Sequence, residues 1–227
     1  MAQISIVIPA YNADNTIGQC LNSILRQSFR DYEIIVVNDG STDKTLKILE
    51  QFEDRIEIIS QKNQGAAAAR NQGAARANSE FIIFCDADIV MKPMMLEKMF
   101  SALKNNSNAA YCYSSFQFGF KTFKLWPFDT VKLKQMPYIH TTSLIRRQSF
   151  PGFDESLKRF QDWDLWLTML EKNQFGCFIP EVLFTVKSGG TMSAWLPKIF
   201  YRLPWKSAKV KKYQAAEEVI RTKHKLN

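Results

Sequence analysis

The first half of the chain alternates short strand-like runs with longer segments of helical periodicity. Apolar, β-rich runs occupy residues 4–8, 33–37, 56–59 and 81–85, and helical patterns lie between them at 15–27, 42–52 and 66–77. Such alternation predicts an α/β fold in which a mostly parallel sheet has helices on its faces. The second and fourth runs are nearly unbroken apolar segments, which is typical of strands buried on both sides.

Polar residues follow these runs where the strands are expected to end. Asn12 and Asp14 follow the first run, residues 38–43 follow the second, and Asp86-Ala87-Asp88 follows the fourth. Ligands of open α/β sheets bind beyond the carboxyl ends of the strands, so we expect a binding site at this edge. Ser41 or Thr42 is expected to cap the helix that begins in the second polar segment.

Two of these segments have residue types that suit phosphate and metal chemistry. Two carboxylates spaced as Asp86 and Asp88 can hold a hard cation such as Mg²⁺ or Mn²⁺, although a solvated turn has the same composition. Arg70 lies near the start of a helix rich in alanine, where exposed amides attract phosphate. An ordinary surface or structural arginine is the alternative.

Charge divides the chain of 227 residues unevenly. The last 41 residues hold 10 of the 30 Lys and Arg but 2 of the 22 Asp and Glu, so they carry the whole net charge of +8. We expect a catalytic domain over 1–193 and a basic helical extension over 194–227. Residues 194–213 mix aromatic and cationic side chains, a pattern that suits either an anionic membrane surface or a helix packed on the domain.

The remaining features point to an ordinary globular protein. Residues 110–186 are irregular and aromatic, with one clear helix at 162–171. The four cysteines are scattered and predict reduced thiols, and both histidines, His140 and His224, are expected to have structural roles. No apolar run approaches the roughly 18 residues that span a bilayer, and the first residues lack the pattern of a signal peptide. We therefore expect the protein in the cytoplasm, with the inner face of the cell membrane as a second location.

The ordered set of motifs resembles the family 2 glycosyltransferases, which have the GT-A fold. The set consists of Pro9-Ala10-Tyr11-Asn12, NDGSTD at 38–43, NQGAAAARNQG at 63–73, CDAD at 85–88, GFDE at 152–155 and QDWDLW at 161–166. The resemblance covers roughly residues 3–193. No single motif is specific, whereas their order and spacing together are.

The resemblance implies an inverting transferase that moves a sugar from a nucleotide-sugar donor, which we expect to be a UDP-sugar. Asp162 matches the catalytic base, and Asp88 matches the residue that binds Mn²⁺ or Mg²⁺ at the donor diphosphate. Asp86 would contact the ribose and Asp39 the base or ribose of the nucleotide. The segment Pro9 to Asn12, together with Arg70 and Ala87, would complete the nucleotide-sugar site.

Two positions depart from the pattern of the family. Its Glu-Asp pair is here Gln161-Asp162, which keeps the base but replaces the preceding acid with an amide. Many relatives also have a metal-binding His at a position that falls here at about Lys187 or Ser188, and neither residue suits a hard cation. Metal binding is then expected to depend on Asp88, phosphates and water.

The resemblance further implies a hexosyl- or N-acetylhexosaminyltransferase whose acceptor is a glycan or polyprenyl-linked saccharide of a bacterial surface polysaccharide. Two alternatives remain at this point. A non-catalytic nucleotide-sugar-binding or scaffold protein would explain Gln161 and the missing His. A nucleotidyltransferase would also use a sheet and a dication, but the first loop lacks the expected Gly-rich basic segment. The tail contains no recognisable nucleic-acid module, and we expect no such partner.

Overall fold

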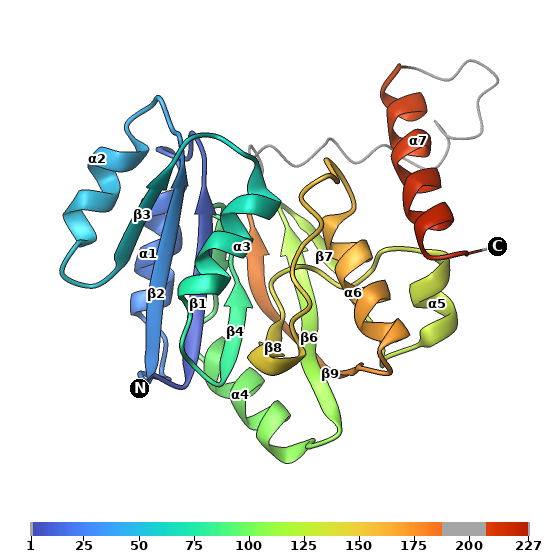
Figure 1. Ribbon diagram of the computed structural model, residues 1–227. Coiled ribbons are helices and arrows are strands. Elements are labelled where there is room, and N and C mark those ends of the chain that lie inside the picture. Colours follow the sequence, from blue (N-terminus) through green and yellow to red (C-terminus); the bar gives the residue numbers. More distant parts are fainter. Residues whose placement is uncertain (1, 188–207, 227) are drawn as a thin grey trace.

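The computed structural model describes residues 2–187 and 208–226 (Figure 1). The first half forms β1 (Ile4–Ala10), α1 (Ile17–Leu25), β2 (Tyr32–Asp39), α2 (Thr45–Leu49), a 3₁₀ turn (Glu50–Phe52), β3 (Glu57–Gln61), α3 (Ala66–Arg76) and β4 (Phe81–Phe84). These four strands pair in parallel in the order β3-β2-β1-β4. The strand–helix alternation in the sequence is thus confirmed as a parallel α/β unit.

The second half extends the same sheet. It adds β5 (Ile89–Met91), α4 (Met95–Asn105), β6 (Ala109–Phe118), β7 (Lys121–Phe123), α5 (Thr130–Gln135), β8 (Leu144–Arg146), a 3₁₀ turn (Arg147–Ser149), α6 (Gln161–Glu171), β9 (Phe175–Val186) and α7 (Ala208–Lys223). The sheet continues from β4 as β8-β6-β9-β5, with β7 beside β6. The pairings of β4 and β6 with β8 are antiparallel, and β6 with β9 is parallel. The predicted fold class is confirmed.

Each face of the sheet has its own apolar core, because alternate residues of a strand point to opposite sides. Ile4, Ile6 and Ile8 of β1 pack in the core that includes α1 and α4. Val7 packs in the core that includes α3, α5 and α6, where Trp163 is fully buried. In Figure 1, α3 and α6 lie in front of the sheet. Burial on both sides explains why the central strands read as unbroken apolar runs.

Strand β1 continues beyond Pro9, where the sequence predicted that it would stop. Backbone groups of alternate residues face the same neighbour, so the nitrogen of Pro9 faces the same side as Val7, toward β4. The β4 partner ends at Phe84, opposite Val7. Pro9 has no backbone N–H to donate, but β4 offers no partner at this position, so none is lost. On its other side, Pro9 still pairs in register with Val37 of β2.

Helix α3 approaches the sheet closely at Gly73, and most of its other buried residues are alanines. A Cβ built on Gly73 would overlap the side chain of Val7, and Val37 lies 3.3 Å away. This close approach places Arg70 of α3 near the carboxyl ends of the neighbouring strands. The small residues of this helix therefore help to position the candidate site.

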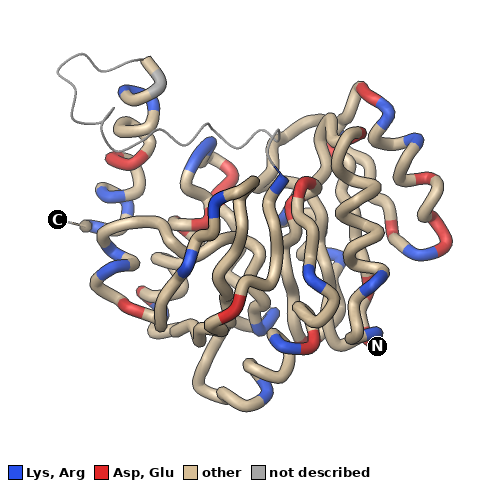
Figure 2. Tube along the Cα trace, turned by 180° about the vertical axis from the view of Figure 1, so that it is seen from behind, with Lys and Arg blue, Asp and Glu red and all other residues tan. Residues whose placement is uncertain are grey.

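Helix α7 returns to the body of the molecule, where it packs near α5 and α6 (Figure 1). Val210 and Ile220 are buried, and the helix carries both basic residues and the adjacent Glu217 and Glu218 (Figure 2). Residues 208–226 thus pack on the domain, whereas most of the segment 194–213, for which the two alternatives were open, lies outside the described residues. The aromatic residues expected to contact a membrane, such as Trp195 and Trp205, lie outside the described residues. Within 2–187 and 208–226, no helix combines the length and hydropathy that a membrane crossing requires.

Candidate active site

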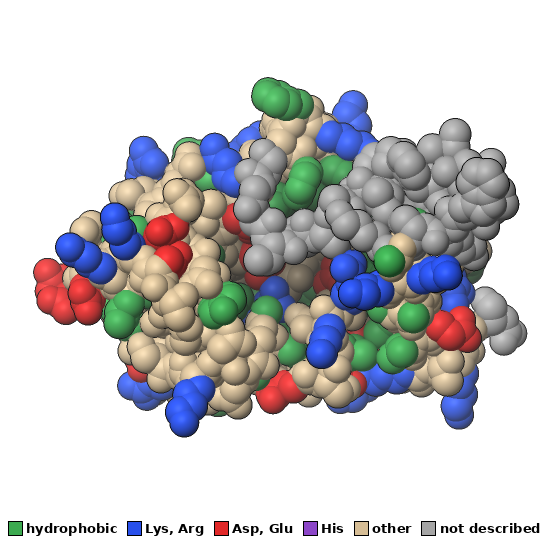
Figure 3. Space-filling model, turned by 90° about the horizontal axis from the view of Figure 1, so that it is seen from above, with side chains coloured by type: hydrophobic (Ala, Val, Ile, Leu, Met, Phe, Trp, Pro, Cys, Tyr) green, Lys and Arg blue, Asp and Glu red, His purple; other side chains and the backbone are tan. Residues whose placement is uncertain are grey.

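The candidate site lies at the carboxyl ends of β1, β2 and β4, which is the upper edge of the sheet in Figure 1. Seen from above in Figure 3, this face has a hollow near its middle with acidic side chains beside it. Residues Ala10, Asp39 and Ala87 are buried at this edge, and Tyr11 is 46% exposed. The topology therefore brings the separate polar segments of the sequence to one place.

Asp39 at the end of β2 organises the loop that precedes α3. Its Oδ1 accepts hydrogen bonds from Gln61 Nε2 and the backbone N–H of Gln64, each at 2.8 Å, and its Oδ2 accepts from the N–H of Gly65 at 2.8 Å. Gly65 has φ +94°, a conformation that suits glycine. The carboxylate is thus already fixed by three donors of the protein.

The segment after β1 is tied to the segment after β2. Asn12, whose φ is +47°, accepts at Oδ1 from the N–H of Thr42 at 2.8 Å, and its own N–H donates to Ser41 Oγ at 3.1 Å. The prediction that Ser41 or Thr42 caps the next helix is therefore wrong. The backbone of Thr45 instead donates to Asp43 Oδ1 at 2.9 Å, so α2 starts three residues later than expected.

Arg70 links three elements of the site. Its Nη2 lies 2.6 Å from Asp86 Oδ1 after β4, and its Nη1 donates to Gln161 Oε1 at 2.9 Å at the start of α6. The guanidinium also lies over the ring of Phe153, 5.2 Å from its centroid. The side chain is 8% exposed, and its Nε has no hydrogen-bond partner among the described residues. This arginine is a buried connector rather than a surface residue.

The two carboxylates of the Asp86-Ala87-Asp88 segment have opposite electrostatic environments. Burial favours the neutral form of Asp86, but the charge of the Arg70 guanidinium and its hydrogen bond outweigh this and hold the pKa of Asp86 below its ordinary value. Burial and the negative charge of Asp86 raise the pKa of Asp88 to about 6. Asp88 therefore lies in a negatively charged environment, which the charge of Arg70 offsets only in part.

Asp162 and Gln161 form the first turn of α6. Burial raises the pKa of Asp162, against the opposing effects of the Trp163 N–H, which donates to Oδ1 at 2.9 Å, and of the Arg70 charge. Gln161 donates from Nε2 to the carbonyl of Leu157 at 2.7 Å while it accepts from Arg70. Because an amide both donates and accepts, Gln161 can join Arg70 to the loop before α6, which a carboxylate could not do.

The side chains available to a metal ion at this site are few. Within the described ranges 2–187 and 208–226, no group of three or more His, Cys, Asp and Glu could hold a metal ion by itself. The backbone N–H of Lys187 donates to the carbonyl of Asp88 at 2.9 Å, so Lys187 lies beside Asp88. One carboxylate suits a Mg²⁺- or Mn²⁺-type ion that takes its other ligands from substrate phosphates and water.

His140 is a residue of this region that sequence reasoning did not assign to the site. It is 8% exposed, packs against the rings of Phe116 and Phe184, and accepts at Nδ1 from the N–H of Thr142 at 3.0 Å. Burial lowers its pKa to about 4 despite the attraction of Asp86. It is thus a neutral imidazole close to the carboxylates. No local motif marks it, since only the fold brings residue 140 to the end of β4.

Comparison with known proteins gives a consistent identification. The family model for glycosyl transferase family 2 matches residues 5–162. The EpsE protein of Bacillus subtilis (strain 168), which is named as a glycosyltransferase, is 28% identical over 202 residues, covering 82% of this chain and 73% of EpsE. The uncharacterized glycosyltransferase YibD of Escherichia coli (strain K12) is 33% identical over 120 residues, covering 51% of this chain and 35% of YibD. The chain thus spans about a third of several curated relatives that it matches.

Solved structures show the same fold at low sequence identity. Staphylococcus aureus TarS 1–349 in complex with UDP-GlcNAc has a TM-score of 0.72 and 20% identity, covering 96% of this chain and 71% of that one. The mannosyltransferase PcManGT of Pyrobaculum calidifontis, in complex with GDP-Man and Mn²⁺, has a TM-score of 0.66 and 15% identity, covering 98% and 70%. The family match, the relatives and the shared architecture lead to one conclusion: this chain belongs to glycosyl transferase family 2 and has the GT-A fold.

Proposed function

We propose that the chain transfers a sugar from a nucleotide-sugar donor to a hydroxyl group of a saccharide acceptor, with inversion at the anomeric carbon. One observation supports this most strongly. Arg70 joins Asp86, at the end of β4, to the first turn of α6, which carries Asp162. The carboxylate that could take the proton of the acceptor, Asp162, is thereby connected to Asp86, which could contact the donor.

Asp162 is the proposed general base. The acceptor oxygen attacks the anomeric carbon while its proton passes to the Asp162 carboxylate, and the bond between the anomeric carbon and the phosphate oxygen breaks. The electron pair leaves with the nucleoside diphosphate. The buried position of Asp162, which raises its pKa, makes it a better proton acceptor than an exposed aspartate.

Asp88 is the proposed protein ligand of a Mg²⁺ or Mn²⁺ ion, with donor phosphates and water as the other ligands. Such an ion would stabilise the charge that develops on the departing diphosphate. The nearby guanidinium of Arg70 holds Asp86 in place as the ribose contact. The Mn²⁺ in the mannosyltransferase PcManGT agrees with this use of a dication.

The donor is proposed to be a UDP-sugar that carries a hexosyl or N-acetylhexosaminyl group, because TarS 1–349 has been solved in complex with UDP and with UDP-GlcNAc. The nucleotide would contact the segment Pro9 to Asn12, as well as Asp39 and Ala87. Asn12 and Asp39 are already held by neighbouring loops. This part of the nucleotide site would therefore be preformed, which lowers the entropy cost of binding.

The acceptor is proposed to be a glycan or lipid-linked saccharide of a bacterial surface polysaccharide, met at the inner face of the cell membrane. In this proposal residues 1–193 are the catalytic domain and 194–227 the basic extension. The extension carries most of the excess of positive charge, which suits an anionic surface.

Calorimetric titration with UDP and GDP, with and without Mn²⁺, tests the proposal together with an assay of nucleoside diphosphate release from a panel of nucleotide sugars. Asp88→Ala should weaken the metal-dependent binding, and Asp162→Asn should abolish turnover while binding persists. Nucleotide binding without turnover in the unaltered chain would favour a non-catalytic binding protein. Release of pyrophosphate would favour a nucleotidyltransferase.

A further inference from the structure

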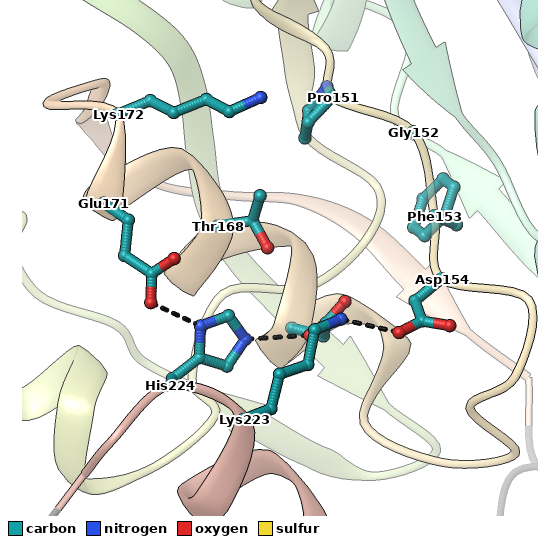
Figure 4. Close-up of a pocket in the computed structure, with 10 residues that line it drawn as sticks. Pro151, Gly152, Phe153, Asp154, Thr168, Glu171, Lys172, Lys223 and His224 are labelled. Carbon is teal, nitrogen blue, oxygen red and sulfur yellow. Dashed lines mark hydrogen bonds and ion pairs between the residues drawn. The ribbon is translucent and has the colours of Figure 1, made fainter.

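A charged cluster outside the candidate active site connects α7 to α6 and to the loop of residues 151–156. Lys223 Nζ lies 2.6 Å from Asp154 Oδ2 and 2.7 Å from Asp164 Oδ1. Figure 4 shows the two basic side chains at the end of α7 reaching toward carboxylates of α6 and of this loop. The Asp164 side chain is 4% exposed, whereas Lys223 and Asp154 are 37% and 30% exposed, so salt screens the contact with Asp164 less than the contact with Asp154.

His224 adds a second contact of the same kind. Its Nε2 lies 2.8 Å from Asp164 Oδ1 and its Nδ1 lies 2.7 Å from Glu171 Oε1 (Figure 4). The ring is 2% exposed. The end of α7 is thus fastened to α6 near its first turn, at Asp164, and at its last residue, Glu171.

Aromatic contacts extend this attachment to the residue before α6. Phe160 has φ +59° and ψ +27°, a left-handed conformation that a non-glycine residue adopts only when its surroundings hold it. The ring of Tyr213 of α7 meets Phe160 edge to face, with centroids 4.9 Å apart. Arg221 lies over the ring of Trp163, 5.8 Å from its centroid. The two residues that α7 contacts here, Phe160 and Trp163, directly flank Gln161 and Asp162 in the sequence.

The other partner of Lys223, Asp154, belongs to the loop that contacts Arg70. Asp154 follows Phe153, whose ring supports the Arg70 guanidinium at 5.2 Å. Asn71, the residue after Arg70 in α3, makes two hydrogen bonds with Phe153. Nδ2 of Asn71 donates to the carbonyl of Phe153 at 2.9 Å, and the N–H of Phe153 donates to Oδ1 of Asn71 at 2.8 Å. One ammonium group therefore joins the element that carries Asp162 to the loop that supports Arg70.

We propose that α7 is a clamp for the active site and that Lys223 is its positioning residue, which fixes the first turn of α6 relative to Arg70. The inference rests on the proposed role of Asp162 as the base. Lys223 does not touch the reacting atoms in this scheme. It acts by holding Asp154 and Asp164 together, and a small displacement of a catalytic group is enough to lower the rate by orders of magnitude.

The test compares Lys223→Ala and Lys223→Arg with a matched control, Lys104→Ala, which removes the exposed ion pair between Lys104 and Glu80 on the far side of the domain. Hydrogen exchange should become faster in Lys223→Ala in peptides that cover 151–156 and 158–167, and stay unchanged in β1 and β2. With whichever of UDP-GlcNAc, GDP-mannose and other nucleotide sugars the unaltered chain turns over, kcat should fall about tenfold or more. KM for the donor should change less than about twofold, and Lys223→Arg should restore most of the rate because it keeps the charge.

Unchanged exchange in 158–167, an unchanged kcat, or a loss equal to that of Lys104→Ala would each overturn the proposal. If Lys223→Ala fails to fold, Asp154→Asn serves instead, since it removes one arm of the bridge and should speed exchange in 151–156. If the unaltered chain turns over no donor, the proposed function fails. Exchange then still decides whether α7 holds the first turn of α6.

Discussion

The contact between Arg70 and Asp86 gives the sharpest test of how the site is held together. Arg70→Met keeps most of the side-chain volume but removes the charge. It leaves Asp86 as an unpaired carboxylate, 24% exposed, and deprives Gln161 Oε1 of its donor. Breaking a buried ion pair by removing one partner costs roughly 3–5 kcal/mol, and the residual exposure of Asp86 places our expectation near the lower end, at about 3 kcal/mol.

Urea unfolding followed by tryptophan fluorescence measures this loss of stability. The matched control is Arg76→Met on the same helix, because the ion pair of Arg76 with Glu57 is exposed and should contribute nothing measurable. Adding Asp86→Asn to Arg70→Met should recover part of the loss, since the uncompensated charge is then removed. A loss no larger than that of Arg76→Met, or a double variant whose loss equals the sum of the single losses, would refute the reasoning.

Three further predictions concern packing and pH. Gly73→Ala should destabilise the chain by roughly 1–3 kcal/mol through overpacking, whereas Gly18→Ala, whose added methyl has 3.8 Å of room, should be neutral or stabilising by up to about 1 kcal/mol in thermal unfolding. Burial lowers the pKa of His224, but its two carboxylate partners outweigh this and raise it, so its contribution to stability is complete below pH 6.5 and is lost as the pH rises through the raised pKa. Unfolding of His224→Gln from pH 5 to 9 checks this, and a gap from the unaltered chain that widens with pH would contradict it. Gln161→Glu places a negative charge beside Asp162 and should raise its pKa further, which moves the acidic limb of the kcat/KM profile to higher pH; an unmoved limb would show that the two side chains do not interact.

The sequence determined the fold class and the order of the main elements, because the period of apolar residues is a local property. The strands at 4–10, 32–39, 57–61 and 81–84 and the helix at 161–171 all overlap the segments that their patterns predicted, although the first strand continues past Pro9. Errors arose where a longer-range partner intervened. The helix expected from residue 42 begins at Thr45, because Asn12 takes the backbone of Thr42.

The candidate site divides in the same way. Residue types and their spacing singled out Asp86, Asp88 and Arg70 as candidates, and the resemblance to the family added Asp162. The contacts between them could not be predicted from the sequence, since Arg70 donates a hydrogen bond to Gln161, which lies 91 positions further along the chain. Equally, Lys223 appeared in the sequence only as one charge of a basic tail.

Only the tertiary structure decided which of these groups share a site and which charges are compensated. Periodicity and turn chemistry act over a few residues and can be read along the chain. The pairing of Lys223 with Asp164, and the burial that raises the pKa of Asp162, depend instead on how α6 and α7 pack on the sheet. Packing is set by the whole core at once, so no short segment of the sequence contains it.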